Sequence, residues 1–263
     1  MGHCTTISVI MSAYNAETFV GRAIESILGQ SYEDFEFIII NDGSTDNTLA
    51  VLHDYSNKDP RIQIINQDNI GLTVSLNKGI SSAKGYYIAR QDADDVSLPD
   101  RLKIQLNLME RDTKIILCGG NCFNIYETFE RDEWGYEEDD QLNRSVFIKA
   151  PFPHSTAFFI KHVANELGGY DETFKTSQDM ELWMRMAKVG CISMIKKPIL
   201  ERYVLSESIS KKRRLRQFFD AYRARWAHNP RKIFITFFSF RSLLISLLPI
   251  KYIHFLKKLQ RRS

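Results

Sequence analysis

Short apolar runs alternate with segments of helical periodicity through the first half of the chain. The apolar runs, which predict buried β-strands, cover residues 7–11, 35–40, 62–65 and 86–89. Amphipathic segments that predict helices follow them at residues 17–28, after Asp46, at residues 73–83 and after Pro99. Continuous apolar strands separated by helices are typical of a parallel sheet that is covered on both faces. The pattern therefore predicts an α/β fold.

The alternation loosens in the second half of the chain. Residues 115–118 and 157–160 predict two further strands. Residues 179–189 predict an amphipathic helix that begins at Ser177 or Gln178. At 263 residues, the chain is long enough for one large domain with an appendage.

Three polar loops directly follow predicted strands, at residues 12–15, 41–44 and 91–95. In a parallel α/β sheet, ligands bind at the carboxyl ends of the strands, so we expect these loops to converge on one site. The loops contain neither a GxGxxG nor a GxxxxGK pattern, which disfavours a Rossmann dinucleotide site and a P-loop. A nucleotide bound here would be held by something other than a glycine cradle.

The loop Asp92-Ala93-Asp94-Asp95 places three carboxylates between a strand and the next helix. Mg²⁺ and Mn²⁺ prefer such oxygen ligands and bind through a few carboxylates together with substrate phosphates. The alternative for this loop is a solvated acidic turn that caps the following helix. In the preceding polar loop, Asp42 is placed to accept hydrogen bonds from a nucleobase or ribose, whereas Asp46 is expected to cap the next helix.

With these loops and later motifs, the chain resembles family 2 of the inverting glycosyltransferases, which have the GT-A fold. The motifs are SVIMSAYN at 8–15, NDGSTD at 41–46, NIGL at 69–72 with NKG at 77–79, DADD at 92–95, GGYD at 168–171 and QDMELW at 178–183. The resemblance runs from Ile7 to Leu205. It implies a GT-A domain over residues 1–205, with a Rossmann-like, mostly parallel sheet and helices on both faces.

The resemblance also implies a nucleotide and metal site. The nucleotide pocket would be lined by Ala13, Tyr14, Asn15 and Glu17, with Asp42 in contact with the base. Asp92 and Asp94 form the family's Asp-x-Asp motif. Within it, Asp94 is expected to bind a divalent metal, Mn²⁺ or Mg²⁺, and Asp92 to lie on the ribose side.

Asp179 matches the family's catalytic base, and His154 matches a histidine that often faces the active site. The helix dipole stabilises a carboxylate in the first turn of a helix, which suits a base at Asp179. For His154, a half-buried structural histidine is an equal alternative. Gln178 stands where the family typically has an acidic residue, so the sequence predicts one charge fewer beside the base.

The reaction implied by the resemblance is inverting transfer of a sugar from a nucleotide-sugar, with UDP the expected nucleotide, to an acceptor hydroxyl. The expected class is a hexosyl- or N-acetylhexosaminyltransferase that acts on a glycan or lipid-linked acceptor in polysaccharide or lipopolysaccharide biosynthesis. Polymerising members carry Gln-x-x-Arg-Trp after the base. The nearest match, at residues 222–226, lacks the glutamine, which predicts a non-processive enzyme. Two alternatives are a metal-dependent nucleotidyltransferase and a non-catalytic nucleotide-sugar-binding protein at the membrane.

Charge is divided unevenly along the chain. From Glu207 onward the sequence has fifteen Lys or Arg and two Asp or Glu, a net +13, which leaves −10 for residues 1–206. An acidic body with a basic, aromatic-rich helical region over residues 206–263 is typical of an enzyme held at an anionic membrane surface rather than of a nucleic-acid binder. Residues 233–250 are almost wholly apolar, but Arg241 near their middle favours helices that lie in the interface over a spanning helix.

The sequence also indicates where the protein acts. A signal peptide would need an apolar stretch of about 7–15 residues near the N-terminus, and the residues before Ile7 do not form one. We therefore expect a cytoplasmic protein, peripheral at the inner face of the cell membrane. The alternative is that the C-terminal helices pack on the catalytic domain. The four cysteines lack the paired spacing of a zinc site, so reduced thiols are expected.

Overall fold

The computed structural model describes residues 6–128, 130–135, 142–204 and 214–228. Its centre is a sheet with strand order β3-β2-β1-β4-β8-β6-β9-β5, in which β7 also pairs with β6. The strands are β1 (Ile7–Ala13), β2 (Phe35–Asp42), β3 (Ile62–Gln67), β4 (Tyr87–Asp92), β5 (Val96–Ser97), β6 (Ile115–Tyr126), β7 (Arg131–Trp134), β8 (Phe158–Ile160) and β9 (Cys191–Val204). The helices are α1 (Val20–Leu28), α2 (Thr48–Ser56), α3 (Leu72–Ser82), α4 (Arg101–Arg111), α5 (Leu142–Ser145), the 3₁₀ turn η1 (His154–Thr156), α6 (Lys161–Glu166), α7 (Gln178–Met186) and α9 (Arg214–His228).

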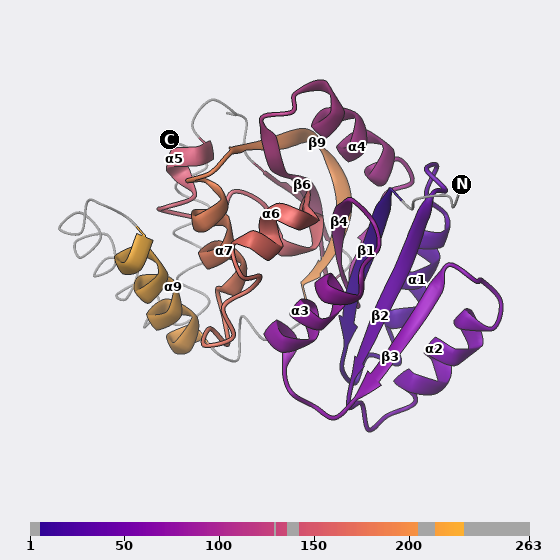
Figure 1. The fold of residues 1–263 in the computed structure, drawn as a ribbon. Helices are drawn as coiled ribbons and strands as arrows, with labels where there is room; N and C mark the ends of the chain where they lie inside the picture. Colours follow the sequence, from indigo (N-terminus) through magenta and orange to yellow (C-terminus); the bar gives the residue numbers. More distant parts are fainter. Residues whose placement is uncertain (1–5, 129, 136–141, 205–213, 229–263) are drawn as a thin grey trace.

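The strands β3, β2, β1 and β4 form the parallel half of the sheet. The chain steps outward from β1 to β3 and then returns to β4 beside β1. Because such crossovers are right-handed, the two outward steps place α1 and α2 on one face and the return step places α3 on the other. The packing agrees, since α1 contacts α2 while α3 lies against β1 and β2 (Figure 1). The predicted parallel sheet with helices on both faces is confirmed.

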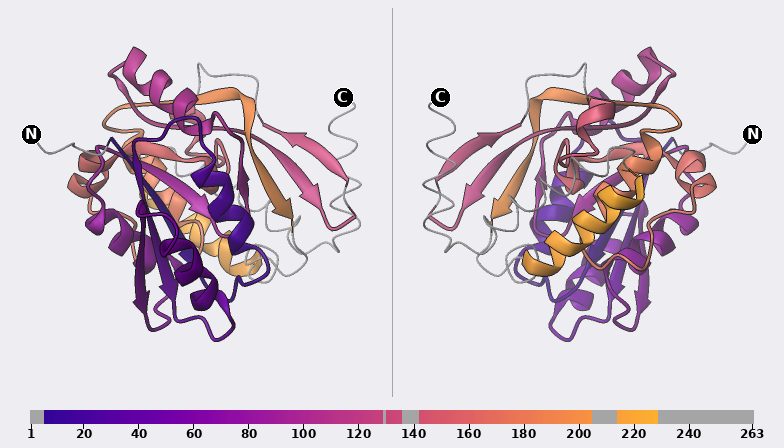
Figure 2. Two further views of the ribbon diagram at one scale, coloured as in Figure 1. Left: turned by 90° about the vertical axis from the view of Figure 1, so that its right-hand side faces the viewer. Right: turned by 90° about the vertical axis from the view of Figure 1, so that its left-hand side faces the viewer.

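The second half of the sheet is mixed. Strand β8 is antiparallel to both β4 and β6, whereas β6 and β9 run parallel to each other. The far ends of β6 and β9, together with β7, extend away from the parallel half (Figure 2). Pairing of β9 with β5 places Glu201 opposite Val96. This pairing brings the end of β9 next to the acidic loop that follows β4.

Helix α7 begins at Gln178, as predicted, and α9 packs against it. Between them lies a small apolar cluster of the buried residues Phe174, Met180, Met184 and Ala224. Helix α9 lies beyond the boundary predicted at residue 205, and it runs beside α7 in Figure 1. The apolar run at 233–250 falls outside the described residues. Within the described part of the chain, no helix combines the length and apolar character needed to cross a bilayer.

Candidate active site

The ends of three strands lie side by side and bring the polar loops together. In the sheet register, Ser12 stands opposite Ile40 on β2 and opposite Asp92 on β4. Ala13, the last residue of β1, stands opposite Asn41. The loops after β1, β2 and β4 therefore leave the same edge of the sheet next to one another, where a parallel α/β sheet binds its ligands.

The loops after β1 and β2 are joined by hydrogen bonds in both directions. Asn15 Oδ1 accepts from the backbone N–H of Thr45 (2.8 Å), and Glu17 Oε2 accepts from that of Asn47 (2.8 Å). In return, Asp46 Oδ2 accepts from the backbone N–H of Glu17 (3.2 Å). Asn15 and Glu17, expected at the nucleotide pocket, thus fix the shape of the loop edge. Tyr14, which precedes Asn15, is 52% exposed at this edge.

Asp42, at the end of β2, is 2% exposed and orders the loop that leads into α3. Its Oδ1 accepts from Gln67 Nε2 (2.9 Å) and from the backbone N–H of Ile70 (3.0 Å). Its Oδ2 accepts from the backbone N–H of Gly71 (3.0 Å). A nucleobase would therefore have to share these oxygens or displace the loop, and the contact of Asp42 with a base stays a prediction.

The three carboxylates at the end of β4 have different pKa values because their neighbours differ. Burial raises the pKa of Asp92, but Arg90, whose Nη2 donates to Asp92 Oδ1, acts with His154 and Arg101 to bring the pKa below its ordinary value. Burial and the adjacent Asp92 raise the pKa of Asp94 to about 6. Burial, together with Asp92 and Asp94, raises the pKa of Asp95 well above its ordinary value.

Asp95 is part of the framework, whereas Asp92 and Asp94 remain open. Asp95 Oδ2 accepts from Ser155 Oγ (2.5 Å), and its Oδ1 accepts from the backbone N–H of Tyr203 on β9 (3.1 Å). These bonds lock the acidic loop against η1 and β9. The side chain of Asp92 is 33% exposed and Asp94 is half-buried. Of the three, Asp92 and Asp94 are therefore the ones that a ligand can reach.

The donor set fits a divalent cation that is bound together with a substrate. Among the described residues, no three His, Cys, Asp or Glu side chains are placed as a complete metal cage. Mg²⁺-type sites in nucleotide enzymes use one or two carboxylates and complete the shell with substrate phosphates and water. The raised pKa of Asp94 reflects burial and repulsion by Asp92, and a bound cation would offset both by favouring the ionised carboxylate. Asp94 and Asp92 are therefore suited to such an ion.

His154 lies near both Asp92 and Asp179, because the charges of both carboxylates affect its pKa. His154 Nε2 is 2.8 Å from Tyr170 Oη, and the ring of Trp183 packs against both rings. Burial and the positive charge of Arg90 lower the pKa of His154 to about 4, against smaller opposing effects of Asp179 and Asp92. His154 is thus neutral at pH 7. Asp179 is half-buried in the first turn of α7.

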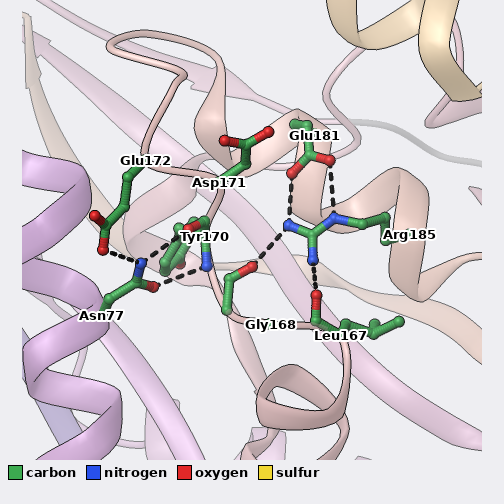
Figure 3. A pocket seen from close by; sticks show the side chains of 9 residues that line it. Asn77, Leu167, Gly168, Tyr170, Asp171, Glu172, Glu181 and Arg185 are labelled. Atoms are coloured by element: carbon green, nitrogen blue, oxygen red, sulfur yellow. Dashed lines mark hydrogen bonds and ion pairs between the residues drawn. The ribbon is translucent and has the colours of Figure 1, made fainter.

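A cleft of about 460 Å³ opens beside this cluster, around the loop that carries Tyr170. It is lined by Asn77, the residues 167–172, and Glu181 and Arg185 of α7 (Figure 3). Asn77 holds the loop from α3, since Nδ2 donates to the carbonyl of Tyr170 (2.8 Å) and Oδ1 accepts from its N–H (2.8 Å). Arg185 holds it from α7 through the carbonyl of Gly169 (2.7 Å). The loop is therefore fixed from two helices.

Arg90 and Tyr170 are site residues that motif reasoning missed. Arg90 is 1% exposed, and its Nε and Nη1 have no hydrogen-bond partner in the structure. A charged residue inside an apolar strand, two positions before Asp92, is a signal in the sequence, because a buried charge needs a partner on the same strand face. The contact of Tyr170 with His154 has no comparable signal, because it depends on how two distant loops meet.

The comparison with known families decides the identity. Residues 8–168, more than half of the chain, match the family model described as glycosyl transferase family 2. The chain belongs to this family. The matched segment holds the loops at the carboxyl ends of β1, β2 and β4 and also His154, whereas α7 and Asp179 follow it.

Curated relatives of this family are similar over most of the chain. An uncharacterized glycosyltransferase from Haemophilus influenzae is 32% identical over 209 residues, which are 73% of this chain and 64% of that relative. The putative glycosyltransferase EpsE from Bacillus subtilis is 34% identical, over 83% of this chain and 76% of its own length. The O-antigen biosynthesis glycosyltransferase WbnJ from Escherichia coli is 35% identical, over 68% and 71%. Hyaluronan and chondroitin synthases from Pasteurella multocida match at 28% identity, over 21% of their lengths.

Solved structures show the same fold. Staphylococcus aureus TarS in complex with UDP-GlcNAc has a TM-score of 0.70 at 17% identity, covering 90% of this chain and 71% of that chain. The mannosyltransferase PcManGT from Pyrobaculum calidifontis in complex with GDP-Man and Mn²⁺ has a TM-score of 0.64 at 16% identity, covering 97% and 79%. The GT-A fold predicted from the sequence is thereby confirmed.

Proposed function

We propose that this family 2 glycosyltransferase transfers a single sugar, with inversion, from a nucleotide-sugar to an acceptor hydroxyl. The observation that carries the proposal is the convergence of the Asp92–Asp94 pair with His154 and Asp179 at one edge of the sheet. The O-antigen name of a relative supports an acceptor in cell-surface polysaccharide or lipopolysaccharide biosynthesis. UDP is the nucleotide proposed, supported by the UDP-GlcNAc complex of a protein with the same fold.

Asp179 is the proposed base. As the acceptor oxygen attacks the anomeric carbon, its proton passes to a carboxylate oxygen of Asp179. The bond from the anomeric carbon to the diphosphate oxygen breaks on the opposite side, so one displacement inverts the anomeric configuration. The first turn of α7 stabilises the negative charge that the base needs before it accepts the proton.

Asp94 is proposed to hold Mn²⁺ or Mg²⁺, with Asp92 beside it on the ribose side. When bound, the cation supplies charge neutralisation for the diphosphate that leaves. Arg90 keeps Asp92 ionised, and the locked Asp95 keeps the loop in place. Neutral His154, held by Tyr170, is proposed to face the bound sugar without adding a positive charge.

Transfer of one sugar per encounter is also a proposal. The partial match to the polymerising motif, residues 222–226, lies on α9, where Tyr222 stacks on Trp226. The segment lacks the glutamine of that motif. A hexose or N-acetylhexosamine is the sugar class proposed. With a defined oligosaccharide acceptor, mass spectrometry should show products one sugar longer; a ladder of longer products would contradict this part of the proposal.

Binding of the nucleotide is the first test. Thermal unfolding of the purified protein is measured with UDP, dTDP, GDP and CMP, each with Mn²⁺ and with EDTA. Because a ligand of the folded state stabilises it by mass action, we expect one nucleoside diphosphate to raise Tm only when Mn²⁺ is present. A shift that persists in EDTA, or no shift with any nucleotide, would contradict the proposed metal and nucleotide site.

Product analysis separates the proposal from its alternatives. A sugar transferase releases a nucleoside diphosphate from the donor, a nucleotidyltransferase releases pyrophosphate, and a binding protein releases neither. Asp179→Asn is expected to reduce kcat by at least about 10²-fold while nucleotide affinity is kept, because a general base contributes about 10²–10⁴-fold. Asp112→Asn, at the exposed end of α4, is the matched control and should retain activity. Retained kcat in Asp179→Asn would contradict the role of this base.

We also propose that the enzyme acts as a peripheral protein at the inner, anionic face of the cell membrane. Leu215, Phe219 and Trp226 lie on one face of α9, are 52%, 59% and 42% exposed, and face away from α7. Exposed Arg216 and Arg223 lie along one side of this stripe. An apolar stripe with basic residues along one side matches the chemistry of an anionic lipid interface.

Vesicle co-sedimentation tests this surface. The full chain is expected to bind vesicles that contain phosphatidylglycerol more than pure phosphatidylcholine, and less as salt is raised. Leu215→Ser with Phe219→Ser should weaken binding about tenfold or more, since each large apolar side chain contributes about 1.5–3 kcal/mol when buried. Val189→Ser, 59% exposed just after α7, is the control. Equal binding of the double variant and the wild type would remove α9 from the proposed interface.

A further inference from the structure

The segment that leads into Asp179 is held from two sides. Residues 171–177 connect the Tyr170 loop with α7. On one side, Thr73 Oγ1 of α3 donates to the carbonyl of Phe174 (2.8 Å). On the other side, Asp220 Oδ2 of α9 accepts from both the N–H (3.2 Å) and the Oγ1 (2.7 Å) of Thr176. Helix α9 therefore holds the residues just before α7 through hydrogen bonds to Thr176.

Helix α9 makes further contacts with the same segment. Ser177 Oγ donates to the carbonyl of Gln217 (3.3 Å). The guanidinium of Arg223 lies 3.8 Å from the centre of the Phe174 ring and donates to Thr173 Oγ1 (3.1 Å). Four residues of the segment, from Thr173 to Ser177, thus contact α9 directly.

The backbone at Ser177 needs this support. Ser177 has φ 56° and ψ 19°, in the left-handed region. Residues other than glycine are disfavoured there, and such conformations persist only where the surroundings impose them. Thr176 and Asp220 are 6% and 7% exposed, so their two hydrogen bonds are protected from water. The start of α7, and with it the direction of Asp179, is therefore set by a buried contact with α9.

We propose that Asp220 is a positioning residue for the base, acting through Thr176 and Ser177. The inference rests on the proposed function, because it assigns a use to the geometry of Asp179. Asp220 does not touch substrate; it holds the backbone from which Asp179 projects. Small displacements of a reacting group reduce rate strongly, so loss of this hold should appear in kcat rather than in nucleotide binding. Helix α9 thereby helps to position the catalytic base.

The experiment compares three variants of the full chain. Asp220→Ala removes both hydrogen bonds to Thr176. Asp220→Asn keeps one side-chain oxygen, which can accept both hydrogen bonds from Thr176. Arg225→Met is the matched control, because Arg225 Nη2 ties α9 to the carbonyl of Ile148 (2.7 Å), away from the base segment. For each protein, kcat, the donor KM, Mn²⁺-dependent UDP binding and Tm are measured.

We expect Asp220→Ala to lower kcat about 10–100-fold with donor KM and UDP binding unchanged. Asp220→Asn should retain most of kcat, and Arg225→Met should lower Tm while kcat is kept. Wild-type kcat in Asp220→Ala would overturn the proposal. An equal loss of kcat in Arg225→Met would also overturn it, because any weakened attachment of α9 would then be enough to lower kcat.

Hydrogen exchange separates failure of this inference from failure of the proposed function. Backbone amides of residues 173–180 should exchange faster in Asp220→Ala than in the wild type, while those of the β1 and β2 loops stay unchanged. This readout needs no substrate. If the wild type shows no turnover and no nucleotide binding, the proposed function is wrong, whereas unchanged exchange at 173–180 overturns the positioning role by itself.

Discussion

At the scale of single residues, the buried guanidinium of Arg90 affects the protonation of several neighbouring groups in the site. Arg90 lowers the pKa of Asp92 and contributes to the low pKa of His154. Asp94 lies next to Asp92, and its pKa rises to about 6. Burial and this guanidinium together keep the imidazole of His154 neutral, and the guanidinium favours the charged form of Asp92, so removal of Arg90 should affect both groups.

Arg90→Met is expected to destabilise the fold. The substitution leaves Asp92 beside Asp94 without its cation, and breaking a buried pair costs about 3–5 kcal/mol. Because the Asp92 side chain is 33% exposed, solvent screening reduces the expected loss to about 1–3 kcal/mol. Urea unfolding at pH 7 measures this loss of stability.

Adding Asp92→Asn to Arg90→Met should restore part of the lost stability. The control is Arg131→Met, whose pair with Glu201 is more exposed and whose loss should cost less than about 0.5 kcal/mol. Additive effects of Arg90→Met and Asp92→Asn would contradict the pairing.

His154 should make stability depend on pH in a defined window. Its pKa is about 4 in the folded protein and 6.5 in an unperturbed chain. Between these values the unfolded state binds more protons, so stability falls as pH is lowered from 6.5 towards 4. From pH 7 to pH 4.5, His154→Gln should lose less stability than the wild type, by about 1–2 kcal/mol in urea unfolding. Exposed His162→Gln is the control. Parallel pH curves for wild type and His154→Gln would show that His154 is not held neutral by the fold.

At the scale of elements, prediction from sequence succeeds where one physical pattern dominates. Strands β1 and β2 of the parallel half are buried on both faces and read as continuous apolar runs, so their positions were predicted. Strand β9 was missed because Lys196, Lys197 and Pro198 interrupt its pattern. In the structure these residues lie at a register shift against Gly120 and Asn121, where a proline is tolerated.

The site also contains residues that the sequence predicted and contacts that it could not predict. The acidic loop and the residues at the strand ends were predicted, because loops after parallel strands must share one edge of the sheet. The links from Tyr170 to His154 and from Asp220 to Thr176 join residues 16 and 44 positions apart. They depend on tertiary packing of loops and helices, and neither periodicity nor spacing encodes that packing.

Packing of α3 on the sheet should depend on Gly79. A methyl group added there would lie 2.5 Å from Ile10 Cγ2 and 3.0 Å from Ile40 Cδ1. Gly79→Ala should therefore destabilise the protein by about 1–3 kcal/mol through overpacking, although alanine is the better helix former by about 1 kcal/mol. In Gly21→Ala on α1, the methyl meets only the flexible end of Tyr55, at 3.3 Å. That control should be neutral or slightly stabilising, and chemical denaturation compares the two. Equal stability of both variants would mean that α3 can shift without cost.

At the scale of the whole molecule, α9 has two faces with different surroundings, one packed against α7 and one exposed to solvent. Its inner face closes the apolar cluster of Phe174, Met180 and Met184 against α7. Its outer face presents an apolar stripe with basic residues along one side, and the acidic transferase body lies behind it. The boundary predicted at residue 205 would separate this helix from the cluster that it covers.

The two C-terminal truncations 1–205 and 1–228 test whether α9 is integral to the domain. Without α9, the fragment 1–205 exposes parts of three buried apolar side chains, each of which contributes about 1.5–3 kcal/mol when fully buried. We expect 1–205 to be less stable than 1–228 by at least about 3 kcal/mol in urea unfolding and to bind a hydrophobic dye. The fragment 1–228, which keeps every described contact of α9, is the reference. If 1–205 and 1–228 unfold at the same urea concentration, α9 is an appendage, and the domain ends near residue 205.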